Sequence, residues 1–286
     1  FTLDVWPGPE PMPHDLLVER VQGCVGLLCM LTDRIDESVV KGGTVKVIAQ
    51  HAVGTNNIDL DCVRERGIAV AHTPGVLTDA TADLAFALIL AAGRRIIPSD
   101  KLVRSGQWRG WAPTLMRGME LDGAVLGIVG MGRIGGAVAR RGQAFGMRVI
   151  HHNRSSGVGL DQLLQESDVI SLHCPLTPDT HHMIDTEAFN KMKNTAILIN
   201  TARGPVVDEG ALVQALEEGQ IWEAGLDVFE EEPIVHPGLL NSEKVVLLPH
   251  IGSATWQTRK TMAQMCANNI LAGLHNQPLP NRVHSL

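Results

Sequence analysis

A glycine-rich segment, Gly130-Met-Gly132-Arg-Ile-Gly135, is the part of the sequence best suited to bind phosphate. It follows the apolar run Val125–Val129 and opens a segment with helical periodicity. In a strand–turn–helix context the first glycine permits a tight turn, the second lets a pyrophosphate approach the backbone, and the third lets helix and strand pack closely. Because the amino end of a helix also presents free N–H groups, the spacing predicts a dinucleotide site. The alternative is an ordinary strand–helix turn with incidental glycines.

The residues about 20 positions further on determine which ribose the site would accept. A carboxylate at this place would bind the ribose 2′-hydroxyl of NAD, but the sequence has Asn153, Arg154 and Ser155. Arg154 is able to pair with a 2′-phosphate and Ser155 to hydrogen-bond it, whereas a carboxylate would repel it. The segment therefore predicts NADP as the cofactor, and the alternative is a solvated Arg154 in a protein that also uses NAD.

Polar side chains that follow later apolar runs carry the functional groups of a carbonyl reduction. Arg203 follows one such run, His250 follows another, and several carboxylates lie between them in the segment 225–233. A guanidinium can hold a planar carboxylate and polarise a carbonyl. A histidine paired with a carboxylate can donate a proton to a developing alkoxide. With 12 histidines and 31 acidic residues in the chain, residue types alone do not show that these groups converge.

The elements that must position these groups alternate between strands and helices. Most of the predicted strands are apolar throughout, as parallel strands covered on both faces require. Strands are predicted at residues 25–30, 45–49, 68–71, 125–129, 148–150, 169–173, 196–200, 225–228 and 245–248, and helices at 78–95, 133–145, 160–166, 209–217 and 255–274. This alternation predicts an α/β fold with doubly wound parallel sheets, which bind ligands at the carboxyl ends of their strands.

Two domains are expected from the length of 286 residues. We expect a contiguous dinucleotide-binding domain at residues 76–255 and a smaller, discontinuous substrate domain at 1–75 and 256–286. The segment 78–95, apolar almost all round, is expected to be a buried helix that bridges two domains or two subunits. Only one helical stretch separates the strands at 148–150 and 169–173, so we expect residues to be missing near Ser156–Gly157. We also expect residues to be missing before Phe1, because no strand and helix precede the first domain.

Composition excludes several other classes of protein. The net charge of −7, the absence of a Lys/Arg-dense run and an aromatic content of 3% argue against nucleic-acid binding. The longest apolar run is far shorter than the roughly 20 residues that span a bilayer, so no membrane association is expected. Five cysteines without a CxxC spacing predict reduced thiols in a cytoplasmic protein. Since HExxH and other ligand spacings are also absent, no metal site is expected.

Taken together, the motifs resemble those of the D-isomer-specific 2-hydroxyacid dehydrogenase family. The resemblance covers nearly the whole chain and preserves the order of the motifs, which are Gly130–Gly135, His173–Pro178, Asn200–Gly204, Gly225–Phe229 with Glu232-Pro233, and Pro249–Ser253. Within the family, the segments Leu27–Asp36 and Pro249–Thr255 are most similar to glyoxylate/hydroxypyruvate reductases. The resemblance implies two Rossmann-like doubly wound domains, a larger NAD(P)-binding one and a smaller flavodoxin-like substrate domain.

The resemblance also implies roles for individual residues. Arg203, Glu232 and His250 take the catalytic roles, and Glu232 holds His250 protonated. The backbone N–H groups of Val53 and Gly54 bind the substrate carboxylate. Cofactor contacts are implied for the glycines above and for Thr78, Arg133, Ile134, Pro175, Thr201, Asp227 and Gly252, with Asp227 on the nicotinamide carboxamide. Trp111 belongs to a segment that reaches the partner subunit's substrate site in such reductases, with plain interface packing as the alternative, and the family pattern implies a homodimer.

The sequence therefore predicts a cytoplasmic, NADPH-preferring reductase of small 2-oxo acids, which converts glyoxylate to glycolate and hydroxypyruvate to D-glycerate. One alternative is a dehydrogenase of another D-2-hydroxy acid, such as phosphoglycerate, although no basic cluster for a substrate phosphate stands out. The other is a nicotinamide-sensing binding protein of the corepressor type, which keeps the same three polar residues. Formate dehydrogenases are disfavoured because they carry an amide at the position of Glu232.

Overall fold

The computed structural model describes residues 1–8 and 10–283, which divide into two compact units. Unit 1 comprises Phe1–Leu77 together with the chain from Thr255 onward, and unit 2 comprises Thr78–Ala254. Parallel strands form the sheets of both units, which confirms the predicted α/β class. Among the described residues, no helix combines the length and the apolar character needed to cross a membrane.

Unit 2 is built on a seven-stranded sheet in the order β10-β9-β8-β7-β4-β5-β6. Its strands are β4 (Val125–Val129), β5 (Arg148–Asn153), β6 (Ser156–Gly157), β7 (Val169–Leu172), β8 (Ile197–Asn200), β9 (Glu223–Leu226) and β10 (Val245–Leu247). Every residue of β4, β7, β8 and β9 is buried, which explains why these strands are predominantly apolar. The strand order reverses at β4, which lies between β5 and β7, and sheets of this kind bind ligands at such a reversal.

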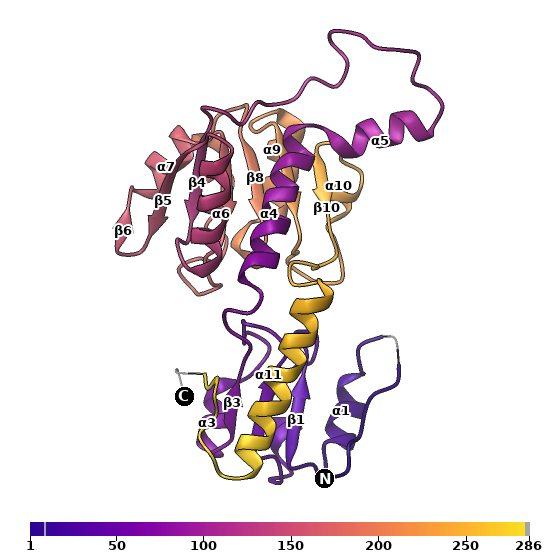
Figure 1. The fold of residues 1–286 in the computed structure, drawn as a ribbon, viewed down its shortest axis with the longest axis vertical. Coiled ribbons are helices and arrows are strands. Elements are labelled where there is room, and N and C mark those ends of the chain that lie inside the picture. Colours follow the sequence, from indigo (N-terminus) through magenta and orange to yellow (C-terminus); the bar gives the residue numbers. More distant parts are fainter. Residues whose placement is uncertain (9, 284–286) are drawn as a thin grey trace. The chain divides into compact units, whose positions relative to one another are not determined.

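Helices cover both faces of this sheet (Figure 1). They are α4 (Thr78–Gly93), α6 (Arg133–Ala144), α7 (Leu160–Glu166), α8 (Thr186–Lys191), α9 (Glu209–Glu218) and α10 (Pro237–Leu240), with a short 3₁₀ turn η1 (Gly204–Val206), whereas α5 (Ile96–Arg104) extends away from the sheet. One hydrophobic cluster joins α4 and α6 to the sheet, and a second joins α7, α8 and α9 to it. One side of α4 is thus buried within unit 2 against α6 and the strands, whereas Ala87 on this helix is exposed.

The connection between β5 and β7 is shorter than in a complete doubly wound sheet. After β5 the chain turns at Arg154 and Ser155 into β6, which pairs antiparallel with β5, and then enters α7. Gly157 permits this tight hairpin, since its φ is +89° and a Cβ there would overlap the carbonyl of His151. The hairpin therefore stands where a helix and a parallel strand are usual.

Unit 1 contains a three-stranded parallel sheet in the order β1 (Gly26–Cys29), β2 (Val47–Gln50) and β3 (Ala69–Ala71). Its helices are α1 (His14–Arg20), α2 (Glu37–Val40), α3 (Leu60–Glu65) and α11 (Trp256–Leu274). Gly273 lets α11 pack directly on β2, because a Cβ there would lie 2.7 Å from the Cβ of Val47. The final helix thus returns to the sheet formed by the first part of the chain.

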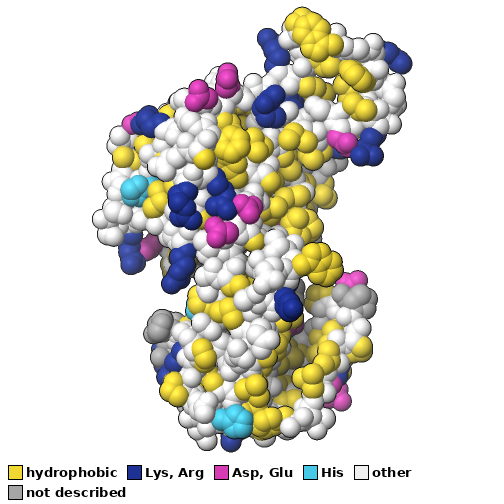
Figure 2. All heavy atoms as spheres, viewed as in Figure 1, with side chains coloured by type: hydrophobic (Ala, Val, Ile, Leu, Met, Phe, Trp, Pro, Cys, Tyr) yellow, Lys and Arg dark blue, Asp and Glu magenta, His cyan; other side chains and the backbone are white. Residues whose placement is uncertain are grey.

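An extension of unit 2 carries exposed apolar side chains. In Figure 1, α5 and the loop after it extend away from the sheet of this unit, and Figure 2 shows hydrophobic side chains over them. The exposed residues are Ile96, Ile97, Val103, Trp108, Trp111 and Leu115. Apolar side chains concentrated on one projecting segment are typical of an interaction surface.

A buried ion pair lies at the base of this extension. Glu223, at the start of β9, is 3% exposed at its side chain, and its Oε1 lies 3.1 Å from Nη1 of Arg95. Arg95 precedes α5 in the left-handed conformation, with φ of 51°. Burial raises the pKa of Glu223 to about 7, and the charges of Arg95 and Lys244 oppose this rise. Glu223 therefore changes its charge near neutral pH in the folded protein.

The free energy of unfolding should depend on pH because of Glu223. Between about pH 4.5 and 7 the folded protein holds a proton on Glu223 that the unfolded chain has released. The free energy of unfolding therefore falls as the pH rises through this range, and the contribution of the bound proton is lost above pH 7. Relative to Glu223→Gln, the free energy of unfolding of the native protein should fall by about 2 kcal/mol between pH 5 and pH 8. Urea unfolding of both proteins across this range measures it, and a difference that does not vary with pH would contradict the assignment.

Candidate active site

The turn between β4 and α6 is shaped by three glycines. Gly130 has φ of +96°, and a Cβ there would lie 2.6 Å from the backbone N of Cys174. A Cβ on Gly135 would overlap the carbonyl oxygen of Gly130, so the third glycine permits the close approach of α6 to the turn. Gly132, by contrast, faces open space within 4 Å. The turn thus leaves room beside the amino end of α6, and these residues fit a pyrophosphate group.

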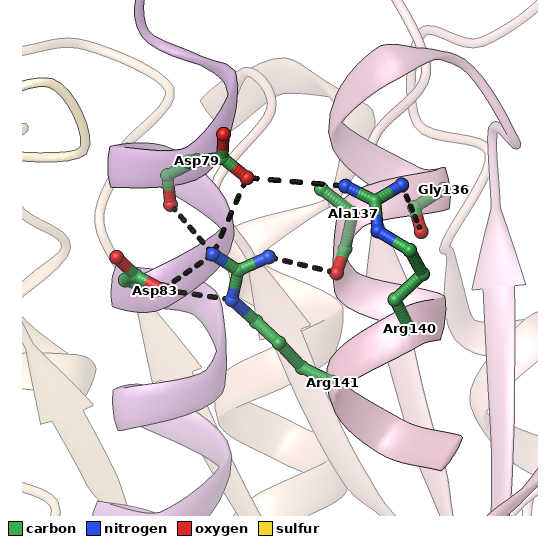
Figure 3. Close-up of polar contacts among 6 residues, drawn as sticks. All are labelled: Asp79, Asp83, Gly136, Ala137, Arg140 and Arg141. Carbon is green, nitrogen blue, oxygen red and sulfur yellow. Dashed lines mark hydrogen bonds and ion pairs between the residues drawn. The ribbon is translucent and has the colours of Figure 1, made fainter. Parts of the chain in front are cut away.

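An arginine on α6 fixes this helix against α4. Figure 3 shows Arg141 of α6 directed toward Asp79 and Asp83 in the first turns of α4. Its Nε donates to Oδ1 of Asp83 over 2.7 Å, and its Nη2 lies 3.4 Å from Oδ1 of Asp79. Its Nη1 also donates to the carbonyl of Ala137 over 2.9 Å. The helix that would hold the phosphates is thereby connected to the start of α4, where Thr78 lies.

Asn153, the last residue of β5, makes hydrogen bonds within the protein, whereas the two residues after it are exposed. Oδ1 of Asn153 accepts a hydrogen bond of 2.7 Å from the N–H of Met131, so Asn153 supports the glycine turn itself. Its Nδ2 donates to Oγ of Ser156 over 3.2 Å. Arg154 and Ser155 are exposed, and their side chains have no polar partner in the part of the chain that the structure describes. A guanidinium thus stands free beside the turn that Asn153 supports.

The other predicted contact residues follow the carboxyl ends of the remaining parallel strands, at one edge of the sheet. Pro175 follows β7, Thr201 and Arg203 follow β8, Asp227 and Glu232 follow β9, and His250 and Gly252 follow β10. The hydroxyl of Thr201 is buried and has no hydrogen-bond partner among the described residues. Since an unpaired buried hydroxyl is costly, this side chain fits a polar ligand.

His250 and Glu232 are in direct contact. Nδ1 of His250 lies 2.7 Å from Oε2 of Glu232, whose Oε1 accepts a hydrogen bond of 3.0 Å from the N–H of Phe229. Both oxygens of the carboxylate are therefore engaged, and its plane is fixed. The second ring nitrogen of His250 remains available for chemistry, because the contact with Glu232 uses only Nδ1.

Asp227 holds the backbone that presents His250. Its two oxygens accept hydrogen bonds from the N–H groups of Ile251, at 2.7 Å, and Gly252, at 2.8 Å. His250 itself adopts a left-handed conformation with φ of 53°, which is uncommon for a residue with a side chain and is here maintained by the adjacent bonds. Burial raises the pKa of Asp227, which is 1% exposed, and the two N–H groups oppose that rise.

Arg203 belongs to the same group of side chains. It is half-buried, its Nη1 donates to the carbonyl of Ala202 over 2.6 Å, and burial lowers its pKa while the charge of Glu232 opposes the change. A Cβ on Gly204 would overlap the carbonyl group of Phe229, so the turn after Arg203 and the loop before Glu232 are in backbone contact. Unit 2 thus brings a guanidinium, an imidazole and a carboxylate together at the edge that carries the glycine turn.

The predicted substrate residues Val53 and Gly54 follow β2 in unit 1. The carbonyl oxygen of Val53 lies 2.9 Å from Nδ1 of His72, and that of Gly54 accepts from Nε2 of Gln50 over 3.2 Å. Within residues 1–8 and 10–283, the N–H groups of Val53 and Gly54 donate no hydrogen bond, so both are available to an anionic ligand. Trp111 lies on the extension of unit 2 and is 84% exposed.

Sequence reasoning missed the structural roles of Asp227 and Asn153. Both were expected to contact the cofactor, and the structure shows that their oxygens also hold the backbone turns of His250 and Met131. The signal that would have indicated this is a short polar side chain at the end of a strand, since Asp and Asn commonly bond nearby backbone N–H groups.

Within the described part of the chain, no group of three or more His, Cys, Asp or Glu side chains is arranged to hold a metal ion.

The two adjacent glycines at the start of α6 provide a matched test of the phosphate turn. Gly135→Ala would place a methyl group against the carbonyl of Gly130, whereas Gly136→Ala enters open space. We expect the first change to weaken the binding of NADPH by about tenfold or more, and the second to leave it within about twofold. Titration of NADPH fluorescence measures both dissociation constants. Equal effects of the two substitutions would contradict the phosphate-binding role of the turn.

The chain is similar to known proteins in sequence and in structure. Residues 86–252 match the family profile described as D-isomer specific 2-hydroxyacid dehydrogenase, NAD binding domain. The chain is 47% identical to a glyoxylate reductase from Thermococcus litoralis, over 99% of this chain and 91% of that protein. A protein from Thermus thermophilus has a similar structure, with 48% identity and a TM-score of 0.92 over 95% of this chain and 90% of that one.

A further solved structure is similar and was determined with a cofactor. It is an NADPH-dependent glyoxylate/hydroxypyruvate reductase from Sinorhizobium meliloti, in complex with NADP and malonate. Its identity to this chain is 32% and the TM-score is 0.86, over 93% of this chain and 85% of the other. On the identity over nearly the whole length and the family match across unit 2, this chain belongs to the D-isomer-specific 2-hydroxyacid dehydrogenase family.

Proposed function

We propose that this enzyme reduces glyoxylate to glycolate and hydroxypyruvate to D-glycerate, with NADPH as the preferred reductant. The observation that carries the proposal is the 2.7 Å contact between Nδ1 of His250 and Glu232, beside Arg203 and at the sheet edge that carries the glycine turn. The glyoxylate reductase from Thermococcus litoralis and the reductase from Sinorhizobium meliloti support the choice of substrates.

The proposed chemistry divides between the protein's own groups and one cofactor. When bound, a reduced nicotinamide supplies a hydride for the carbonyl carbon of the substrate. Arg203 binds the substrate carboxylate and polarises the adjacent carbonyl. His250 donates a proton from its free ring nitrogen to the carbonyl oxygen as negative charge develops there, and the carboxylate of Glu232 stabilises the protonated imidazole. The carbonyl thereby gains a hydride and a proton and becomes a secondary alcohol, or a primary one in glycolate.

Substrate recognition has a further component in unit 1. We assign the N–H groups of Val53 and Gly54 to the substrate carboxylate, since neither has a partner among the described residues. The same assignment makes unit 1 the substrate domain and unit 2 the dinucleotide-binding domain. The match of residues 86–252 to a NAD binding domain supports the second part.

The preference for NADPH rests on Arg154. This side chain is exposed at the end of β5, next to Ser155 and beside the turn that Asn153 supports. A guanidinium at that place attracts a 2′-phosphate, and the carboxylate that would bind a ribose 2′-hydroxyl is absent from 153–155.

The assembly and location of the enzyme are also part of the proposal. We assign the exposed apolar residues of α5 and the following loop to a homodimer interface, in which Trp111 contacts the other copy either at its substrate site or as packing. All five cysteines are free, which supports a reducing compartment such as the cytoplasm.

His250 is the residue whose replacement tests the function most simply. Native protein should oxidise NADPH over many turnovers when glyoxylate is added, as followed by the loss of absorbance. His250→Ala should lower kcat by about 10³-fold, because the proton donor is lost, while the dissociation constant of NADPH stays within about twofold. His275→Ala is the matched control, since His275 is an exposed residue at the carboxyl end of α11 in unit 1. A His250→Ala enzyme with near-native kcat would contradict the proposed acid, and native protein without turnover would contradict the function.

Arg154→Asp tests the cofactor preference. Replacing the guanidinium by a carboxylate removes an attraction to the 2′-phosphate and offers an acceptor to the ribose hydroxyl of NADH. The ratio of kcat/KM for NADPH to kcat/KM for NADH should fall by about tenfold or more. Arg148→Asp, at the other end of β5, should leave the ratio unchanged. If both variants keep the native ratio, Arg154 does not select the cofactor.

A further inference from the structure

Glu230, two residues before the proposed catalytic carboxylate, makes an exchange of hydrogen bonds with the start of α9. Its Oε1 accepts from the N–H of Glu209 over 2.7 Å, and its own N–H donates to Oε1 of Glu209 over 2.8 Å. Glu209 is the first residue of α9, whose N–H groups have no partner inside the helix. Each glutamate thus binds the backbone of the other, and the loop before Glu232 is attached to the amino end of α9.

The environment of Glu209 makes this exchange specific. The residue is 6% exposed, and burial raises the pKa of its carboxyl group. A buried carboxyl group is costly unless its oxygens accept hydrogen bonds, so Glu209 favours the one placement of the loop that supplies the N–H of Glu230. The exchange therefore selects a position for the loop as well as stabilising it.

The second oxygen of Glu230 reaches a third segment. Oε2 lies 2.8 Å from Nε2 of His182, whose ring stacks on His181 at 4.1 Å between centroids. The N–H of His182 donates to the carbonyl of Pro205 over 2.8 Å, in the turn directly after Arg203. Glu230 is consequently connected, through His182, to the turn that presents the proposed substrate-binding guanidinium.

The loop that Glu230 holds determines the orientation of Glu232. The N–H of Phe229 donates to Oε1 of Glu232, and Oε2 of Glu232 faces His250. Phe229 also packs its carbonyl against Gly204, with no space for a Cβ between them. A shift of residues 229 and 230 would therefore move the carboxylate away from the imidazole and change its distance from Arg203.

We infer that Glu230, held by Glu209 and His182, is a positioning residue that sets the carboxylate of Glu232 against His250 and Arg203. Glu230 has no part in binding or in proton transfer, and it acts through the backbone of Phe229. The inference rests on the proposed function, since it concerns the same proton donor. Its consequence is that the catalytic step depends on the hydrogen bonds that Glu230 makes with Glu209 and His182.

Two substitutions of Glu230 separate positioning from general stability. Glu230→Ala removes the two contacts of the side chain, with the N–H of Glu209 and with Nε2 of His182. We expect kcat for glyoxylate to fall by about tenfold, because small displacements of reacting groups lower the rate by this much or more. KM for glyoxylate and the dissociation constant of NADPH should change by about twofold or less, because the turn after Arg203 keeps its backbone hydrogen bond from His182 to Pro205 and the glycine turn is not touched. Glu230→Gln keeps an oxygen for the N–H of Glu209 and a polar group for His182, so it should recover kcat to within about threefold of the native value.

Glu166→Ala is the matched control. Glu166 also pairs with a cation on the surface of unit 2, at 3.1 Å from Arg148, and lies on α7 away from Glu232. Its removal should leave kcat unchanged. Melting temperatures of all variants show whether a loss of kcat accompanies a loss of fold.

The outcomes distinguish the two proposals. A native kcat in Glu230→Ala would overturn the positioning role while leaving the proposed function intact. Equal losses in Glu230→Ala and Glu230→Gln, together with a matching fall in melting temperature and in the number of NADPH sites, would also overturn it in favour of a purely structural role. Native protein without turnover would overturn the proposed function, and the positioning role with it.

Discussion

The contact between His250 and Glu232 is the interaction on which the proposed chemistry depends. At 2.7 Å between Nδ1 and Oε2, it orients the imidazole ring and leaves the other ring nitrogen available for the proposed proton transfer. The contact exists only because two loops from different strands meet, one held by Asp227 through the N–H groups of Ile251 and Gly252 and one held by the N–H of Phe229. Two loops at the sheet edge of unit 2 therefore position the proposed proton donor, His250.

Close backbone approach is the second constraint, and it explains why glycines recur at this edge. Gly135 lets α6 approach the turn at Gly130, and Gly204 lets the turn after Arg203 touch the carbonyl of Phe229. A side chain at either place would separate elements that carry functional groups. The same sheet edge thus joins the phosphate turn to the acid–base pair, as expected for ligands bound at the carboxyl ends of parallel strands.

Much of this arrangement was predictable from the sequence, for definite physical reasons. Uninterrupted apolar runs indicated the buried strands β4, β7 and β8, and the glycine spacing indicated the turn before α6. The helices α1 and α5 were not predicted, because both segments are short and mix charged with apolar residues. Among three consecutive acids at 230–232, no sequence pattern showed that Glu230 would bind α9 while Glu232 faces His250, since their directions depend on tertiary contacts.

The most direct test of the central claim is to follow a labelled hydride into the product. Native enzyme would be incubated with hydroxypyruvate and NADPH carrying deuterium at the transferable position of the nicotinamide ring, and the product analysed by mass spectrometry and chiral chromatography. Hydride transfer from the nicotinamide to the carbonyl carbon predicts glycerate with one deuterium on C2, and membership of the D-isomer-specific family predicts the D-isomer. Product without deuterium, the L-isomer, or no product at all would contradict the account.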